Sequence, residues 1–177
     1  MLAGPCRPFS RTFDMDGVIR PATADDFEAI WAIFQAVVAP GDAFAYTPET
    51  TGAEARSLWM GPTNHTWVAT VGGTVAGTYF VRPNQPGRGS HVANAGYMVS
   101  PAFRGKGIGR AMALDSLVRA KHLGYKAMQF NFVVSTNEPA VRLWKEIGFA
   151  VVGTLPGAFR HATQGDVDVY VMHRHLD

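Results

Sequence analysis

A glycine-rich turn at residues 104–110 is the stretch of the chain best suited to chemistry. It reads Arg-Gly-Lys-Gly-Ile-Gly-Arg and joins a β-rich run, which ends at Val99, directly to a helical run. The three glycines carry no side chains, so successive backbone N–H groups can converge on a phosphate at the positive end of the helix. Three cationic side chains add charge at the same place: Arg104, Lys106 and Arg110. The turn therefore predicts a phosphate-binding site.

Two common nucleotide motifs do not fit this turn. The order Gly105, Gly107, Gly109 does not give G-x-G-x-x-G, and Gly105-Lys106 is followed by glycine rather than serine or threonine. A dinucleotide fingerprint and a Walker loop are therefore excluded. A different phosphate ligand is expected, and the alternative interpretation is a purely structural turn that caps the helix.

Residues 104–109 resemble the acetyl-CoA pyrophosphate loop of the GCN5-related N-acetyltransferases (GNAT). The pattern of that family is Gln or Arg, two residues, Gly, any residue, then Gly or Ala. Residues 137–149, Asn-Glu-Pro-Ala-Val-Arg-Leu-Trp-Lys-Glu-Ile-Gly-Phe, look like the second CoA-contacting helix of the family. The resemblance runs from about residue 18 to the C-terminus. It implies the GNAT fold and transfer of an acetyl group from acetyl-CoA to an amine, without a metal.

The same resemblance assigns contacts to the co-substrate by position. The strand at Tyr97, Met98 and Val99 would pair its backbone with the pantetheine arm. The Val99 N–H would bond the thioester carbonyl as negative charge develops there. Asn137 would approach the pantetheine and can also be the N-cap of a helix, and these roles are compatible. The pyrophosphate would be held by the loop residues Arg104, Gly105, Lys106, Gly107, Ile108, Gly109 and Arg110.

The chain departs from the family at Trp144. Many members carry a tyrosine there, which donates a proton to the departing CoA thiolate, and an indole cannot do this. Trp144 either lines the thiol end of the co-substrate or belongs to the core. Tyr97 and Tyr170 are alternative acids, and water or one of the six histidines would accept the proton of the amine. No hydroxyl or thiol with an adjacent base suggests a nucleophile, so we expect direct transfer within a ternary complex.

A narrower resemblance concerns the acceptor. Residues 91–101 and 130–137, with 83–87 and 155–160, look like the fungal azetidine-2-carboxylate acetyltransferases that act on proline analogues. Asn94 and Asn131 fall on neighbouring central strands, and an amide can both donate to a carboxylate and accept from an amine. They are expected to orient a small imino or amino acid, or else to be satisfied buried amides that fix the splay of the strands.

Other acceptors and one other class of function stay open at this point. The alternatives are a protein N-terminus, a polyamine, an aminoglycoside, or a non-catalytic acetyl-CoA sensor that needs only the loop and the strand. A polyamine site favours an acidic cluster. Residues 39–62, the segment expected to shape the acceptor site, contain only Asp42, Glu49 and Glu54.

Hydrophobic periodicity places these motifs in an α/β fold, with a mixed central sheet of about seven strands and helices on both faces. Hairpins come early in the chain and strand-helix-strand units come late, which indicates a mixed sheet. Residues 1–16 are expected to be a flexible tail and residues 17–177 a single domain. Strands are predicted near 18–20, 67–71, 74–81, 91–99, 126–134, 149–155 and 167–175, and helices at 23–40, 49–59, 107–123 and 138–147.

Composition limits the remaining function classes. The 177 residues have a formal charge of +2, which is too small a surplus to predict binding to nucleic acid or to a membrane. The single cysteine, Cys6, excludes an internal disulfide. No apolar run approaches the roughly 20 residues of a membrane span. We expect a cytoplasmic protein with a small-molecule partner, and family analogy adds a homodimer.

Overall fold

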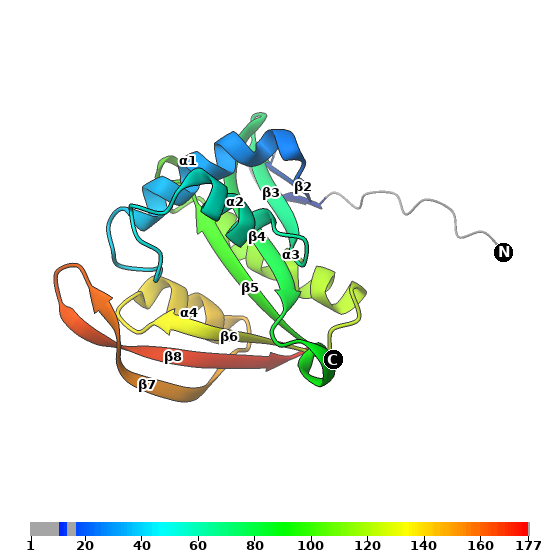
Figure 1. Cartoon of the computed structure of the whole chain (residues 1–177). Coiled ribbons are helices and arrows are strands. Elements are labelled where there is room, and N and C mark those ends of the chain that lie inside the picture. The colour runs from blue at the N-terminus through cyan, green and yellow to red at the C-terminus, as the bar shows by residue number, and fades with distance from the viewer. Residues whose placement is uncertain (1–10, 14–16, 177) are drawn as a thin grey trace.

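A mixed sheet of eight strands organises the chain, in the spatial order β1-β2-β3-β4-β5-β6-β8-β7. The structure, a computed structural model, describes residues 11–13 and 17–176. Figure 1 shows helices lying over both faces of this sheet. The strands are β1 (Arg11–Phe13), β2 (Gly17–Pro21), β3 (His65–Val71), β4 (Thr74–Pro83), β5 (Val92–Val99), β6 (Ala127–Val134), β7 (Ala150–His161) and β8 (Gly165–His175).

The seven predicted strands are confirmed as β2 to β8. The short β1 is an addition, because it lies within the predicted tail and pairs antiparallel with β2. Strand β7 continues to His161, past the end predicted at Leu155. Pro156 is tolerated because β7 lies at the edge of the sheet and its register shifts between Leu155 and Phe159. The remaining residues of the predicted tail, among them Cys6, lie outside the described part of the chain.

Four α-helices occur among the described residues: α1 (Phe27–Val38), α2 (Gly52–Met60), α3 (Ile108–His122) and α4 (Glu138–Glu146). Three short 3-10 helices accompany them: η1 (Ala24–Asp26), η2 (Gly87–Gly89) and η3 (Pro101–Phe103). Helix α2 begins at Gly52 rather than near Glu49, because Thr51 and Glu54 form a capping box there. Predicted helix ends elsewhere differ by a residue or two, apart from the η1 turn that precedes α1.

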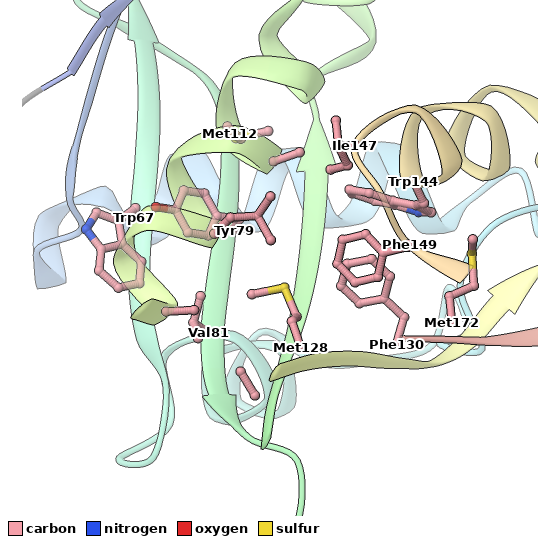
Figure 2. Packing of buried hydrophobic residues seen from close by; sticks show 14 of the residues in the cluster. Trp67, Tyr79, Val81, Met112, Met128, Phe130, Trp144, Ile147, Phe149 and Met172 are labelled. Carbon is pink, nitrogen blue, oxygen red and sulfur yellow. The ribbon is translucent and has the colours of Figure 1, made fainter. Parts of the chain in front are cut away.

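Alternation along β4 divides the core into two layers. Tyr79 and Val81 belong to the cluster beneath α3 and α4, whereas Phe80 belongs to the cluster beneath α1 and α2. Successive side chains of a strand point to opposite faces, so the two pairs of helices cover opposite faces of the sheet. Figure 2 shows the larger layer, in which Phe130 of β6 lies beside Trp144 and Phe149, and Met128 points toward β4.

The sheet opens between β5 and β6. These two strands are the parallel pair, and their register contains only Val92 with Ala127 and Ala93 with Met128. Every other neighbouring pair is antiparallel and longer. Figure 1 shows β5 and β6 diverging from their shared end. The divergence leaves two strand edges facing a gap in the centre of the sheet.

No helix in the described part of the chain is long and apolar enough to cross a membrane.

Candidate active site

A cavity of about 290 Å³ occupies the opening between β5 and β6. Its walls come from β4, β5, β6, α4 and the loop between α1 and α2. The lining residues are Ala43, Phe44, Ala45, Tyr46, Phe80, Arg82, Asn94, Ala95, Gly96, Tyr97, Phe130, Asn131, Phe132, Val133, Val134, Asn137, Ala140 and Trp144. Five of the residues singled out from the sequence are among them: Asn94, Tyr97, Asn131, Asn137 and Trp144.

The free edge of β5 presents backbone groups to this opening. Ser100 N–H donates to Ala76 O at 2.9 Å, and Asn84 N–H donates to Val92 O at 2.8 Å. Partners alternate along an antiparallel pair, so the N–H and C=O groups of Tyr97 and Val99 point away from β4 and toward the opening. This orientation is the one that the predicted role of the Val99 N–H requires.

Met98 is turned the other way. By the same alternation its backbone groups face β4, and its side chain is 1% exposed within the cluster beneath α1 and α2. The geometry therefore does not favour the direct contact with the co-substrate that was predicted for Met98.

The glycine-rich turn lies just beyond the end of β5. Gly105 and Gly107 have φ angles of 73° and 76°, a left-handed conformation that glycine adopts without strain. Gly107 is the N-cap of α3, so the first N–H groups of that helix have no partner within it. A Cβ on Gly109 would lie 3.7 Å from Val99 Cγ2, which places the turn beside the N–H donor on β5.

Cationic side chains surround the turn as expected. Arg104, Lys106 and Arg110 are exposed. Arg110 pairs with Glu146 of α4 at 3.1 Å, and Lys106 lies 5.0 Å from the centre of the Phe103 ring. Ile108 is buried beneath them and anchors the first turn of α3. The turn combines free helix N–H groups with positive charge, so its geometry suits a phosphate group.

Trp144 joins the core and the cavity wall. Its side chain is 8% exposed, and its ring centre lies 4.9 Å from that of Tyr97 and 4.7 Å from that of Phe130. Figure 2 shows the indole beside Phe130 and Phe149. Trp144 therefore belongs to the core, and its packed ring also contributes to the lining of the cavity. Its place at the thiol end of the co-substrate stays a prediction.

Tyr97 is poorly suited to replace the missing acid. Its hydroxyl is hydrogen-bonded to Ser116 Oγ at 2.7 Å, and burial raises its pKa well above the ordinary value. A phenol with a raised pKa is a weaker proton donor. Tyr170, the other candidate, packs against the core layer beneath α3 and α4 rather than lining the cavity.

Asn137 caps α4, as the sequence predicts. Its side-chain oxygen accepts from Ala140 N–H at 3.4 Å. The amide also lines the cavity, so its NH₂ group remains suited to the predicted contact with a ligand.

Asn94 fills the apex of the opening between the two strands. Its Nδ2 donates to Gln129 O at 2.9 Å, a carbonyl on the edge of β6 that faces β5. The side chain replaces a strand-to-strand hydrogen bond at the point where the strands separate. Its Oδ1 is a second polar atom that can accept from an amine. Asn94 thus fixes the splay and keeps an acceptor at the cavity.

Asn131 belongs to a chain of side-chain amides. Its Oδ1 accepts from Gln129 Nε2 at 2.8 Å, and its Nδ2 donates to Asn84 Oδ1 at 2.7 Å. Each amide has two N–H groups and two lone pairs on oxygen, so one donor and one acceptor position remain on Asn131. These two hydrogen bonds to neighbouring amides hold the Asn131 side chain in one orientation at the cavity wall.

The prediction from sequence missed the wall opposite these amides. Phe44 and Tyr46 stack with ring centres 5.8 Å apart, and both line the cavity with Phe80 and Arg82. Arg82 is the Cα partner of Asn94 across β4 and β5. Alternation along the strand puts Phe80 and Arg82 on one face, but their place beside Asn94 depends on the register of β4 and β5, which the sequence does not show.

Charge in the cavity is limited to one residue. Arg82 is the only charged side chain among the lining residues, which include no Asp, Glu, Lys or His. No group of three or more His, Cys, Asp and Glu side chains that could hold a metal ion occurs within residues 11–13 and 17–176. Chemistry here must rely on hydrogen bonding, positioning and the one guanidinium.

The sequence and the structure both match known proteins. A family model described as Acetyltransferase (GNAT) family matches residues 27–149. N-acetyltransferase aca1 of Schizosaccharomyces pombe is 40% identical over 104 residues, which are 58% of this chain but only 50% of that protein. The structure of a GCN5-related N-acetyltransferase from Kribbella flavida matches at 47% identity and a TM-score of 0.86, covering 90% of this chain and 97% of that one.

A third match bears on the fold alone. The structure of a GNAT superfamily phosphinothricin acetyltransferase from Sinorhizobium meliloti, in complex with acetyl-CoA, has a TM-score of 0.80 at 24% identity, covering 90% of this chain and 88% of that chain. The predicted GNAT fold is confirmed by these matches.

Proposed function

The chain belongs to the acetyltransferase (GNAT) family and is an N-acetyltransferase, and from this premise we propose that it acetylates the amine of a small amino or imino acid, such as L-azetidine-2-carboxylate. The observation that carries the proposal is the single cavity between β5 and β6. Its lining includes Tyr97, two residues before Val99 on the strand that leads to the glycine-rich turn, and the side-chain amides of Asn94 and Asn131.

The donor side is formed by the strand edge and the turn. Acetyl-CoA would place its pyrophosphate on the N–H groups of the turn and extend its pantetheine along the free edge of β5. The Val99 N–H then points at the thioester carbonyl, where it stabilises the oxyanion of the transition state. Trp144 and Ala140 exclude water on that side.

The acceptor side holds the amine against the thioester. Asn94 Oδ1 and the remaining polar positions of Asn131 would orient the acceptor, and Phe44, Tyr46 and Phe80 surround its apolar part. Bringing the two reactants together in one site supplies a large part of the acceleration.

Proton transfer in this scheme uses water. The ammonium first loses a proton to water, because the lining residues include no carboxylate or imidazole. The neutral amine forms a C–N bond with the thioester carbon, and its nitrogen, now positively charged, loses a proton to water. The C–S bond then breaks to give the amide, and the CoA thiolate leaves or takes a proton from water. No covalent acetyl-enzyme forms.

Polyamines, aminoglycosides and protein N-termini are less well suited to this cavity. Their amines are cationic and lack a neighbouring carboxylate, and the lining offers them no acidic side chain. These acceptors, and a sensor that binds acetyl-CoA without turnover, are the alternatives that the following experiment separates.

The test is release of free CoA thiol from acetyl-CoA with a panel of amines at equal concentration. The panel contains L-azetidine-2-carboxylate, L-proline, phosphinothricin, lysine, spermidine and a short peptide. We expect turnover with the small amino or imino acids. Turnover confined to spermidine or the peptide would contradict the acceptor class, and tight binding of acetyl-CoA without turnover on any amine would favour the sensor.

A further inference from the structure

Arg82 holds the only charge in the cavity, and that charge is not balanced by a carboxylate. No ion pair joins Arg82 to an acidic side chain among residues 11–13 and 17–176. The residue is half-buried on β4, where its guanidinium lies 5.2 Å from the centre of the Phe80 ring. A guanidinium over an aromatic face is held in place by that contact.

Neighbouring groups define the direction from which a ligand would meet Arg82. Asn94 is its direct partner across β4 and β5, and both side chains lie on the face beneath α1 and α2. Tyr46 forms the facing wall. Desolvation raises the pKa of the Tyr46 hydroxyl, and the positive charge of Arg82 opposes this shift, which indicates that the two groups are near each other. The guanidinium therefore faces the cavity between an amide and a phenol.

A lone cation in a partly enclosed, largely apolar cavity discriminates by charge. It repels a ligand that carries only ammonium groups, and it attracts a carboxylate, which can accept two parallel N–H bonds from the guanidinium. An amino or imino acid carries both groups within a few bonds. With its carboxylate on Arg82, its amine would reach the Oδ1 of the adjacent Asn94.

We propose that Arg82 is the specificity-determining residue of this enzyme, and that it selects acceptors with a carboxylate next to the amine by pairing with that carboxylate. The inference rests on the proposed function and names the residue that would recognise the carboxylate of such an amino or imino acid. It assigns to β4 a part in acceptor recognition that complements the amides of β5 and β6.

The test compares matched acceptors that differ only in the carboxylate. The kcat/KM of acetyl transfer is measured for L-azetidine-2-carboxylate, its carboxamide and unsubstituted azetidine, with the wild type, Arg82→Gln and Arg82→Lys. The wild type is expected to prefer the acid. Arg82→Gln should lower kcat/KM for the acid about 30-fold or more, mainly through KM, since truncating one partner of a buried charged pair costs about 2 kcal/mol or more.

Two further results complete the expected pattern. Arg82→Gln should leave the carboxamide and azetidine within a few-fold of the wild type, and Arg82→Lys should recover part of the loss, because it keeps the charge without the planar fork. Arg88→Gln, an exposed arginine in η2 outside the cavity lining, is the control and should behave as the wild type. Binding of acetyl-CoA to each variant verifies that it is folded.

The possible outcomes distinguish a failure of the proposed role of Arg82 from a failure of the proposed function. A wild type that acetylates azetidine as well as the acid, or an Arg82→Gln enzyme that loses activity equally on all three acceptors, would overturn the role of Arg82 and leave the acetyltransferase assignment intact. A wild type that acetylates none of the three, while it acetylates a polyamine or peptide, would overturn the proposed acceptor class together with this inference.

Discussion

At the scale of single residues, the proposed chemistry depends on which backbone and side-chain groups face the opening between β5 and β6. Val99 contributes an N–H rather than a side-chain function, because the alternation set by the Ser100 to Ala76 hydrogen bond turns that N–H outward. Truncating the Val99 side chain leaves this N–H donor in place, so a test must remove the N–H itself.

Val99→Pro removes that donor without breaking a bond to β4. We expect kcat to fall about 10²- to 10³-fold, the loss typical of removing one oxyanion donor. Binding of acetyl-CoA should change little, since the bond is strongest in the transition state. Steady-state kinetics and calorimetric binding measure the two effects. A fall in acetyl-CoA affinity with unchanged kcat would contradict this role of the backbone N–H.

Tyr97→Phe tests whether the hydroxyl of Tyr97, which lines the cavity, donates a proton to the CoA thiolate. Its hydroxyl is occupied by Ser116 and its pKa is raised by burial, so we expect kcat to stay within a few-fold of the wild type. Loss of the hydrogen bond should lower the free energy of unfolding by about 1 kcal/mol. A hundredfold loss of kcat, with stability unchanged, would instead identify Tyr97 as the proton donor.

At the scale of elements, the turn before α3 contains one glycine that its backbone conformation requires, Gly107, and one that has room for a side chain, Gly109. Gly107 has a φ of 76°, whereas a Cβ on Gly109 would make only an ordinary contact, at 3.7 Å from Val99 Cγ2. Gly107→Ala should therefore destabilise the fold by about 1–3 kcal/mol and raise the KM for acetyl-CoA. Gly109→Ala is the matched control. Urea denaturation measures the free energy of unfolding of both variants. An equal loss of that free energy in the two would contradict the requirement for glycine at residue 107.

The start of α1 gives a pH-dependent contribution to stability. Arg20 donates to Asp26 at 2.7 Å and, with Thr23, lowers the pKa of that carboxyl to about 2. A carboxyl with a lowered pKa stabilises the fold above its unfolded pKa, and this contribution is lost as the pH falls from about 4 through 2. Asp26→Asn should reduce stability at pH 7 by about 1–2 kcal/mol and flatten its acid dependence.

Thermal unfolding of wild type and Asp26→Asn between pH 2 and pH 7 measures that difference. The two curves should converge toward pH 2, because the wild-type carboxyl becomes protonated there. Parallel curves over the whole range would show that the ion pair does not supply the acid dependence.

The elements themselves were largely predictable because they depend on local patterns. β-Rich runs bounded by turn residues identified β2 to β8, and capping residues identified the starts of α1 and α4, whereas the start of α2 was misplaced. The extension of β7 past Pro156 was not predictable, since it depends on the position of that strand at the edge of the sheet. The role of Asn94 as a bridge to Gln129 O was also hidden, because it requires the register of two strands joined through α3.

At the scale of the whole molecule, the site is produced by one interruption of the sheet. Strands β2 to β5 carry α1 and α2, and strands β6 to β8 carry α4 on the opposite face. The backbone pairing between the two halves of the sheet is limited to the short β5–β6 ladder. The loop between α1 and α2 is tied to the other half where Ala162 N–H donates to Gly41 O at 3.0 Å. That contact holds the aromatic wall of Phe44 and Tyr46 over the opening.

The candidate site was predicted from sequence only on its co-substrate side. The glycine-rich turn is a contiguous motif, so its residues could be found together. The acceptor side is assembled from β4, β5, β6 and the α1–α2 loop, and no local pattern joins Arg82 or Tyr46 to Asn94. Such a site becomes visible only when strand order and register are known.

The most direct test of the central claim is a crystal structure of the protein with CoA and L-azetidine-2-carboxylate bound together. We predict the pantetheine along the free edge of β5, its thiol end reaching the cavity near Val99 N, and the carboxylate within hydrogen-bond distance of Arg82. An acceptor bound elsewhere, or a CoA thiol directed away from the opening between β5 and β6, would contradict the account.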